Sequence, residues 1–139
     1  MESSHVRKLS ICIERPAAEA YEFLSVPQNF PKWASGLGKS LREVDGEWIA
    51  ETPAGPARVS FSERNSYGVL DHSVVLPQGT SVYVPLRVLP RERGCELELT
   101  LIRRPGVSEE QFAADAAWVL RDLEAAKRLL ERGGDHGGQ

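Results

Sequence analysis

The stretch VSEEQFAADAAWVLRDLEAAKRLLER, residues 107–132, decides the fold of this chain. Ser108 and Gln111 form an S-x-x-Q capping box, and Val107 and Phe112 stand at the positions of a hydrophobic staple. With about 100° of rotation per residue, the apolar residues that follow fall on one stripe. They are Phe112, Ala116, Val119, Leu123, Ala126 and Leu130, with Leu120 at the margin. The stretch therefore predicts a long amphipathic helix whose apolar side must be covered.

Upstream of this helix the apolar residues recur at every second position, which is typical of half-buried strands. The clearest run, 95–103, alternates Cys95, Leu97, Leu99 and Leu101 with mostly polar residues. The other candidate strands are 6–14, 40–44, 47–52, 57–64, 69–76 and 81–89. Short connections rich in turn-forming residues separate most of them, and such connections join antiparallel neighbours. Between the first two strands, proline-bounded segments predict two short helices.

These patterns predict an α+β domain in which a curved antiparallel sheet of about six or seven strands wraps around the C-terminal helix. A length of 139 residues suits one domain with a single core, and we place this domain at residues 1–132. Gly133 and Gly134 predict the end of the helix. Residues 133–139 are expected to form a disordered tail.

Composition argues against several classes of function. The net charge of −3 gives no broad basic field, so nucleic acid is not an expected partner. No apolar run approaches the roughly 18–20 residues of a membrane helix, and the N-terminus lacks the pattern of a secretion signal. A cytoplasmic location is expected by default. No cofactor or metal motif occurs, and Cys12 and Cys95, each within a strand-like run, are expected to be small buried thiols.

Several short motifs accompany this order of elements. They are ERPA at 14–17, NFPKW at 29–33, GVLDH at 68–72, PLRV at 85–88, RPG at 104–106 and DLEAAK at 122–127. Over essentially the whole chain they resemble the START-like (SRPBCC) superfamily, and their local sequence resembles its polyketide cyclase/dehydrase type. The resemblance implies a helix-grip fold with a cavity between the sheet and the long helix, entered near the short helices. It does not define one activity, because the superfamily includes carriers, cyclases, hormone receptors and co-chaperones.

His72 is the foremost candidate for a functional side chain. Strand alternation places it inward between Leu70 and Val74, where its ring needs a hydrogen-bond partner. It could orient a ligand, move a proton near neutral pH, or be a core histidine bonded to a neighbouring strand. Asp71 must face the opposite side of a regular strand, so adjacency alone does not make these two residues a dyad.

Three other side chains allow both a functional and a structural interpretation. Trp33 lies where the resemblance places the mouth of the cavity, either as an aromatic gate or as a packing residue. Arg87 points outward by strand parity and is expected at the surface, unless a bulge at Pro85 redirects it toward a carboxylate ligand. Trp118 lies off the main stripe of the long helix and is expected to pack on a sheet edge or the first helix, or else to mark a dimer contact.

We expect a small hydrophobic or aromatic molecule to bind in the cavity, with His72 and either Tyr83 or Arg87 orienting its polar end. The expected lining is Trp33, Phe61, His72, Val74, Val84, Leu86, Leu99, Phe112, Ala116 and Val119, with space at the small Ala116. Two alternatives stay open: an enzyme of the cyclase/dehydratase type that uses His72 as acid or base, and a co-chaperone-like interaction module. The protein is expected as a monomer or homodimer. A cavity beside His72 would favour either ligand role, whereas a sealed ring would exclude both.

Overall fold

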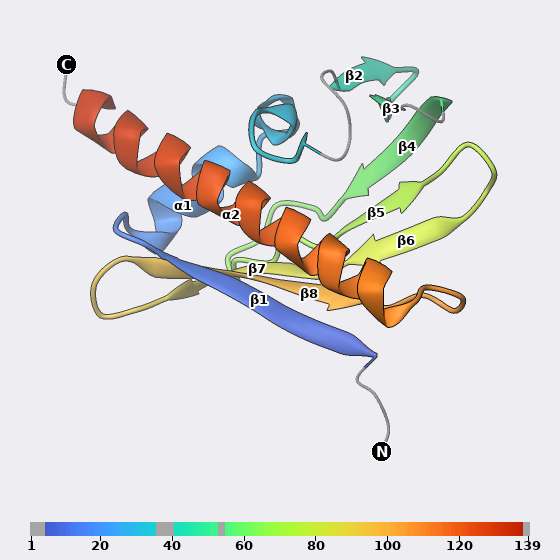
Figure 1. Ribbon diagram of the computed structural model, residues 1–139. Helices are drawn as coiled ribbons and strands as arrows, with labels where there is room; N and C mark the ends of the chain where they lie inside the picture. The colour runs from blue at the N-terminus through green and yellow to red at the C-terminus, as the bar shows by residue number, and fades with distance from the viewer. Residues whose placement is uncertain (1–4, 36–40, 53–54, 138–139) are drawn as a thin grey trace.

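Eight strands, two α-helices and one short 3-10 helix make up the described part of the chain (Figure 1). The computed structural model describes residues 5–35, 41–52 and 55–137, with side chains as far as residue 132. The order is β1 (Val6–Ile13), α1 (Ala17–Leu24), η1 (Pro27–Lys32), β2 (Leu41–Val44), β3 (Glu47–Thr52), β4 (Gly55–Phe61), β5 (His72–Val75), β6 (Ser81–Val84), β7 (Leu86–Pro90), β8 (Cys95–Ile102) and α2 (Glu109–Gly137). Ser40, the first residue of one predicted strand, lies outside the described residues. The predicted α+β class is confirmed.

The strands form two antiparallel sheets instead of the one sheet predicted. One sheet has the order β1-β8-β7, and the other has the order β2-β3-β4-β5-β6. Figure 1 shows α2 crossing the first sheet, while β4, β5 and β6 extend beside the helix. The curved sheets and the long helix together give the predicted helix-grip arrangement.

The two sheets separate at Pro85, inside the predicted strand 81–89. Proline has no N–H to donate to a ladder, and the chain changes partner at this residue. β6 pairs with β5, whereas Leu86 in β7 pairs with Leu99 in β8. The prediction of one strand over 81–89 is therefore wrong. The predicted strand 69–76 is also too long, because β5 covers only part of it.

Helix α2 begins where the sequence predicts. Ser108 Oγ accepts a hydrogen bond from the Gln111 N–H at 3.0 Å, which satisfies one of the free donors at the helix start. The side chain of Gln111 donates to Asp115 Oδ1 at 2.8 Å. Ser108 therefore caps the helix, while Gln111 supports the first turn along the helix surface.

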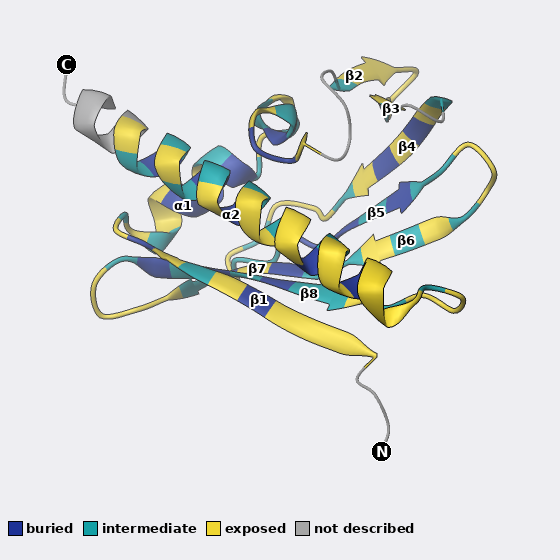
Figure 2. Cartoon of the chain, viewed as in Figure 1, coloured by how far each residue is buried: buried dark blue, intermediate teal, exposed yellow. Residues whose placement is uncertain are grey.

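The apolar stripe of α2 is buried as predicted, and Figure 2 shows the exposed outer face of the same helix. The buried members are Phe112, Ala116, Leu123, Ala126 and Leu130, whereas Val119 is half-buried and Leu120 is exposed. No helix among the described residues is long and apolar enough to cross a membrane.

The end of α2 differs from the prediction. The helix continues through Gly133 and Gly134 to Gly137. Glycine lowers helix stability by about 1 kcal/mol relative to alanine, but it keeps its N–H and does not break the hydrogen-bond ladder. The predicted stop at these glycines is therefore wrong, and residues 138–139 of the predicted tail lie outside the described residues.

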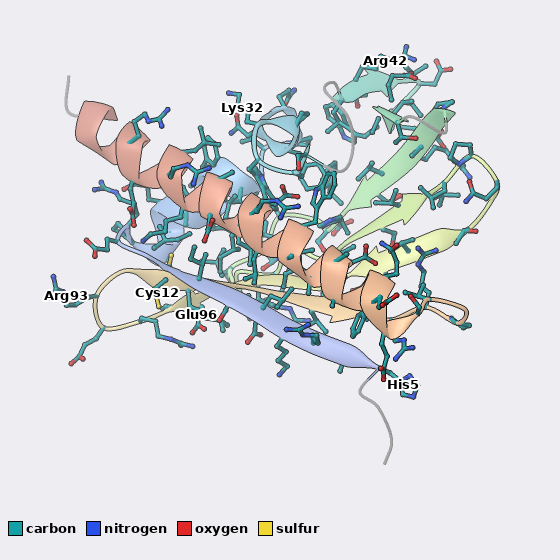
Figure 3. All side chains as sticks on the ribbon, in the orientation of Figure 1. His5, Cys12, Lys32, Arg42, Arg93 and Glu96 are labelled. Atoms are coloured by element: carbon teal, nitrogen blue, oxygen red, sulfur yellow. The ribbon has the colours of Figure 1, made fainter. Side chains whose placement is uncertain are left out.

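The face of β1 and β8 that points away from α2 carries Cys12. Leu9 and Ile13 are buried on the inner face, so strand alternation turns Cys12 outward, opposite Glu96 in the register (Figure 3). The expectation of two buried thiols is confirmed for Cys95 and wrong for Cys12.

Candidate functional site

A cavity of about 130 Å³ lies where α1, η1, the end of β4 and the start of β5 meet. A cavity of roughly 150 Å³ can hold benzene, so this space suits a single ring. Its lining is Tyr21, Leu24, Ser25, Phe30, Trp33, Phe61, Ser62, Arg64, Leu70, His72 and Leu86. A larger groove of about 500 Å³ shares some of this lining, but the exposed charged residues Glu47 and Arg58 also line it.

Aromatic rings form one wall of the cavity. The ring of Phe30 stands edge-on to those of Trp33, Phe61 and His72, with centroid distances of 5.3, 5.3 and 5.0 Å. Phe61 and His72 come together because they are register partners on β4 and β5, and η1 brings Phe30 and Trp33 to them. Edge-to-face pairs of this kind add about 0.5–1.5 kcal/mol beyond burial, so the wall holds its shape without a ligand.

His72 contributes a hydrogen-bond acceptor to this wall. Its side chain is buried, and Nδ1 lies 3.1 Å from the carbonyl oxygen of Leu70. A carbonyl only accepts, so Nδ1 carries the proton and Nε2 keeps its lone pair. Burial lowers the pKa of His72 below its ordinary 6.5, and this effect exceeds the raising effects of the Leu70 hydrogen bond and the Asp71 charge. The imidazole is therefore neutral near pH 7, and no described residue donates to Nε2.

Trp33 contributes a donor. Its side chain is only 4% exposed, and its indole N–H has no hydrogen-bond partner among the described residues. By contrast, Nε1 of the exposed Trp118 donates to Ser35 Oγ at 2.9 Å. A buried N–H without a partner costs about 1–3 kcal/mol. Trp33 thus lines the cavity and holds a buried donor that no described residue uses.

Polar residues form the mouth of the cavity. Arg64, whose side chain is 61% exposed, makes an ion pair with Glu22 of α1 and lies over the ring of Tyr21 at 5.4 Å. Its Nη1 lies 3.4 Å from Ser25 Oγ. The Ser62 hydroxyl donates to the carbonyl oxygen of the residue that precedes His72. The cavity thus has an aromatic interior and one cation at its edge.

The sequence interpretation missed the role of Asp71, which lies outside the cavity. Its carboxylate is buried and accepts hydrogen bonds from the Tyr83 hydroxyl at 2.6 Å and from the Leu86 N–H at 2.9 Å. Arg87 donates to both carboxylate oxygens at 3.3 Å. Burial alone would raise the pKa of Asp71, but these hydrogen bonds and the Arg87 charge together hold it below its ordinary 3.8.

Asp71 and Arg87 refine two expectations about this sequence. Arg87 lies at the surface as expected, with its side chain 46% exposed, and it pairs there with the carboxylate of Asp71. Its alternative role as a ligand anchor stays a prediction. Tyr83, the other proposed anchor, is bound to the same carboxylate. The sequence signal that could have revealed this group of side chains around Asp71 is Pro85. Where the chain leaves its sheet at a proline, the next backbone N–H loses its strand partner and needs another acceptor.

The predicted lining residues do not all meet. Trp33, Phe61, His72 and Leu86 line the cavity. Val74 lies in a second apolar cluster with Ala50, Ala57 and Val59. The remaining predicted residues are buried in the core or packed against it, namely Val84, Leu99, Phe112, Ala116 and Val119. The space is therefore beside η1, and Ala116 is packed in the core. A role of these residues in ligand binding stays a prediction.

The lining residues that the sequence interpretation missed come from the short helices and from the ends of the predicted strands 57–64 and 69–76, which in the structure form the connection between β4 and β5. They are Tyr21, Leu24, Ser25 and Phe30 from the short helices, and Ser62, Arg64 and Leu70 from the connection between β4 and β5. Within the described part of the chain, no group of His, Cys, Asp and Glu side chains could hold a metal ion.

Comparison with known proteins identifies the fold of this chain. No protein-family model and no curated protein sequence matches this chain. Among solved structures, DynU16 of the dynemicin biosynthetic locus is 15% identical with a TM-score of 0.71 over 94% of this chain, which spans only 49% of DynU16. A START superfamily protein from Mycobacterium smegmatis is 10% identical with a TM-score of 0.69, and the match covers 93% of this chain and 99% of that one.

The protein Ara h 8.0201 is 11% identical with a TM-score of 0.67, and the match covers 92% of this chain and 98% of that one. At such low identity these likenesses establish the fold alone. The chain therefore has the START-like helix-grip fold, as the resemblance implied.

Proposed function

We propose that the protein binds a small single-ring molecule that carries a hydroxyl or carbonyl oxygen. The observation that carries the proposal is the pairing of Trp33 and His72 in one cavity of about 130 Å³. Trp33 has a donor without a partner, and His72 has an acceptor without a described donor. A hydroxyl both accepts and donates, so a ligand that carries one matches the hydrogen-bonding chemistry of both groups.

Burial of the ring supplies most of the affinity in this proposal. Apolar surface removed from water contributes about 25 cal/mol per Å², and the edge-to-face rings of Phe30 and Phe61 offer such surface. The polar contacts then select among molecules of similar size, because a ligand that pairs with the buried Trp33 N–H removes the cost of leaving that donor without a partner.

Calorimetric titration with phenol and benzene tests the proposal. Phenol is expected to bind about two- to tenfold more tightly than benzene, since a hydrogen bond of about 0.5–1.5 kcal/mol distinguishes them. Trp33→Phe should remove most of this preference. Trp118→Phe is the matched control, because it also deletes an indole N–H, but one that donates to Ser35 outside the cavity.

Two outcomes would contradict the proposal. The first is absence of measurable binding for both probes, together with native mass spectrometry that finds no co-purified small molecule on protein from its own host. The second is an equal loss of phenol affinity in the Trp33 and Trp118 variants, which would mean that the effect is general and not local to the cavity.

An enzyme of the cyclase/dehydratase type is the second candidate, and the neutral His72 favours it. With Nδ1–H held by Leu70, Nε2 is positioned as a general base. The volume of about 130 Å³ argues for the binding role, because a polyketide-like chain is larger than a single ring. A His72→Phe variant that keeps ring binding but loses turnover of a candidate substrate would favour the enzyme.

The remaining expectations stand as predictions within this proposal. They are a cytoplasmic carrier role, lipid transport, a monomeric or homodimeric state, and no cofactor or nucleic-acid partner. The co-chaperone-like alternative would require a stable protein partner and an exposed apolar patch to receive it.

A further inference from the structure

We infer that the ligand is a hydroxyaryl carboxylate whose anionic end is recognised by Arg64 at the mouth of the cavity. This inference rests on the proposed function and names its ligand class. It starts from the rim residues Ser25, Ser62 and Arg64, which are the polar lining residues outside the aromatic wall apart from the phenol of Tyr21.

The hydroxyl groups of the rim have no hydrogen to offer a ligand. Ser25 Oγ donates to the carbonyl oxygen of Glu22 at 3.3 Å, and Ser62 Oγ donates to that of Asp71 at 2.6 Å. Each hydroxyl has only one hydrogen, so both are already committed.

Arg64 is different because a guanidinium has five N–H donors. Its hydrogen bonds within the described residues are one from Nη1 to Ser25 and one from Nη2 to Glu22. Most of its donors are therefore available, and they belong to a permanent cation. The mouth thus selects an acceptor, and preferentially an anionic one.

The position of Arg64 is fixed by its neighbours. Its guanidinium lies 5.4 Å from the centre of the Tyr21 ring, and Tyr21 Oη accepts a hydrogen bond from the Asn65 N–H at 2.8 Å. Glu22 also contacts the guanidinium, through the ion pair. A planar guanidinium held in this way loses little freedom when a carboxylate binds to it in a bidentate manner.

Glu22 is the competitor in this arrangement. Its carboxylate occupies part of the surface that a ligand carboxylate would use, and its charge repels an anion. Trp33 and His72 in the interior are suited to bind a hydroxyl, whereas Arg64 at the mouth is suited to bind a carboxylate. A ring that carries one group at each end meets both requirements.

The test compares para-hydroxybenzoate with para-hydroxybenzamide, which has the same shape but no charge, by calorimetric titration at pH 7. The carboxylate should bind more tightly in the unmodified protein. Arg64→Gln should lower its affinity about fivefold or more, because a charge-assisted pair is lost, and Arg64→Lys should restore part of it. Amide and phenol binding should change little.

Glu22→Gln gives the decisive result, because the expected sign is opposite. Removal of the competing charge should raise affinity for para-hydroxybenzoate about two- to fivefold, the range of exposed ion pairs. Glu51→Gln is the matched control, since Glu51 pairs with Arg42 at 2.8 Å on β2 and β3, outside the cavity lining.

The outcomes separate this inference from the proposed function. If phenol binds but the carboxylate-to-amide ratio is the same in the unmodified protein, Arg64→Gln and Glu22→Gln, then Arg64 only latches α1 to the rest of the protein and the inference is overturned. If none of the three probes binds, the proposed function fails and the inference falls with it. A ratio that falls in Arg64→Gln and rises in Glu22→Gln supports both.

Discussion

Asp71 and His72 are neighbours in the chain, yet their side chains meet opposite conditions. The Asp71 carboxylate accepts hydrogen bonds from Tyr83, Leu86 and Arg87 on the outer side of the sheet. The His72 ring faces the aromatic cavity and uses only Nδ1. One residue has its hydrogen-bonding capacity met by the protein, whereas the other leaves an acceptor free.

This difference separates a structural polar group from a candidate binding group. A buried network in which every member is paired stabilises one arrangement of the chain. Here that arrangement is the break at Pro85, because Asp71 accepts the first N–H after the proline. A buried polar atom without a partner lowers the stability of the fold. A ligand that supplies the partner removes this cost, so the atom then contributes to binding.

Loss of the Asp71 carboxylate should have the largest effect on stability. Asp71→Ala leaves the buried Leu86 N–H without an acceptor and removes the charge that holds Arg87. We expect the free energy of unfolding to fall by about 2–4 kcal/mol, the range for a charged hydrogen-bonded group whose partners stay behind. Urea denaturation followed by circular dichroism measures the change.

Glu51→Ala serves as the reference for this variant. It breaks the ion pair between Arg42 and Glu51, whose side chains are 59% and 48% exposed, and such a pair contributes about 0–1 kcal/mol. If Asp71→Ala lowered the free energy of unfolding no more than this reference, the hydrogen bonds of Asp71 would not be a structural network that stabilises the fold.

His72 should make stability depend on pH near neutrality. Burial lowers its pKa in the folded protein, so the unfolded chain binds a proton first as the pH falls below about 6.5. Its stabilising contribution is complete above that pH and is lost as the pH falls toward the folded-state value. The slope should reach at most about 1.4 kcal/mol per pH unit, measured by urea denaturation between pH 7.5 and pH 5.

His72→Phe should remove this slope, and it keeps an aromatic ring beside Phe30. His5→Gln is the control, because His5 is exposed at the start of β1 and its replacement should leave the slope in place. A slope that persists in His72→Phe would assign the proton to another group and weaken the claim that the ring is neutral in the cavity.

Local periodicity predicted the parts of this fold that depend on one element at a time. The start of α2, its apolar stripe and the inward position of His72 follow from spacing along a helix or a strand. The division into two sheets does not, because it depends on which strand each half of 81–89 pairs with. Pro85 indicates in the sequence where the strand breaks. The division into two sheets follows only from the pairing of one half with β5 and of the other half with β8.

The same limit applies to the candidate site. Trp33, Phe61 and His72 were identified from their residue type and expected position, and they meet in the cavity. Arg64 could not be found in this way, since it follows the end of β4 and reaches α1 through a contact between residues 42 positions apart. Tertiary contacts of this kind leave no periodic signal in the sequence.

The smallest expected effect concerns Arg87, which is one of several groups bound to Asp71. Its side chain is 46% exposed, so solvent screens the ion pair and Arg87→Gln should cost only about 0.5–1 kcal/mol at pH 7. The Asp71 pKa is lowered in the folded protein, so its stabilising contribution is present above about 3.8 and is lost as the pH falls through the folded-state pKa.

Replacement of Arg87 should move the Asp71 pKa upward and reduce the stability lost on acidification. NMR titration of the Asp71 carboxyl carbon measures the first change, and urea denaturation at pH 5 and pH 2.5 measures the second. The Leu86 N–H and the Tyr83 hydroxyl still hold the carboxylate in this variant. Arg87→Gln should therefore keep the break at Pro85. If the Asp71 pKa were unchanged in this variant, the Leu86 N–H and the Tyr83 hydroxyl alone, without the cation, would be what stabilises the Asp71 carboxylate.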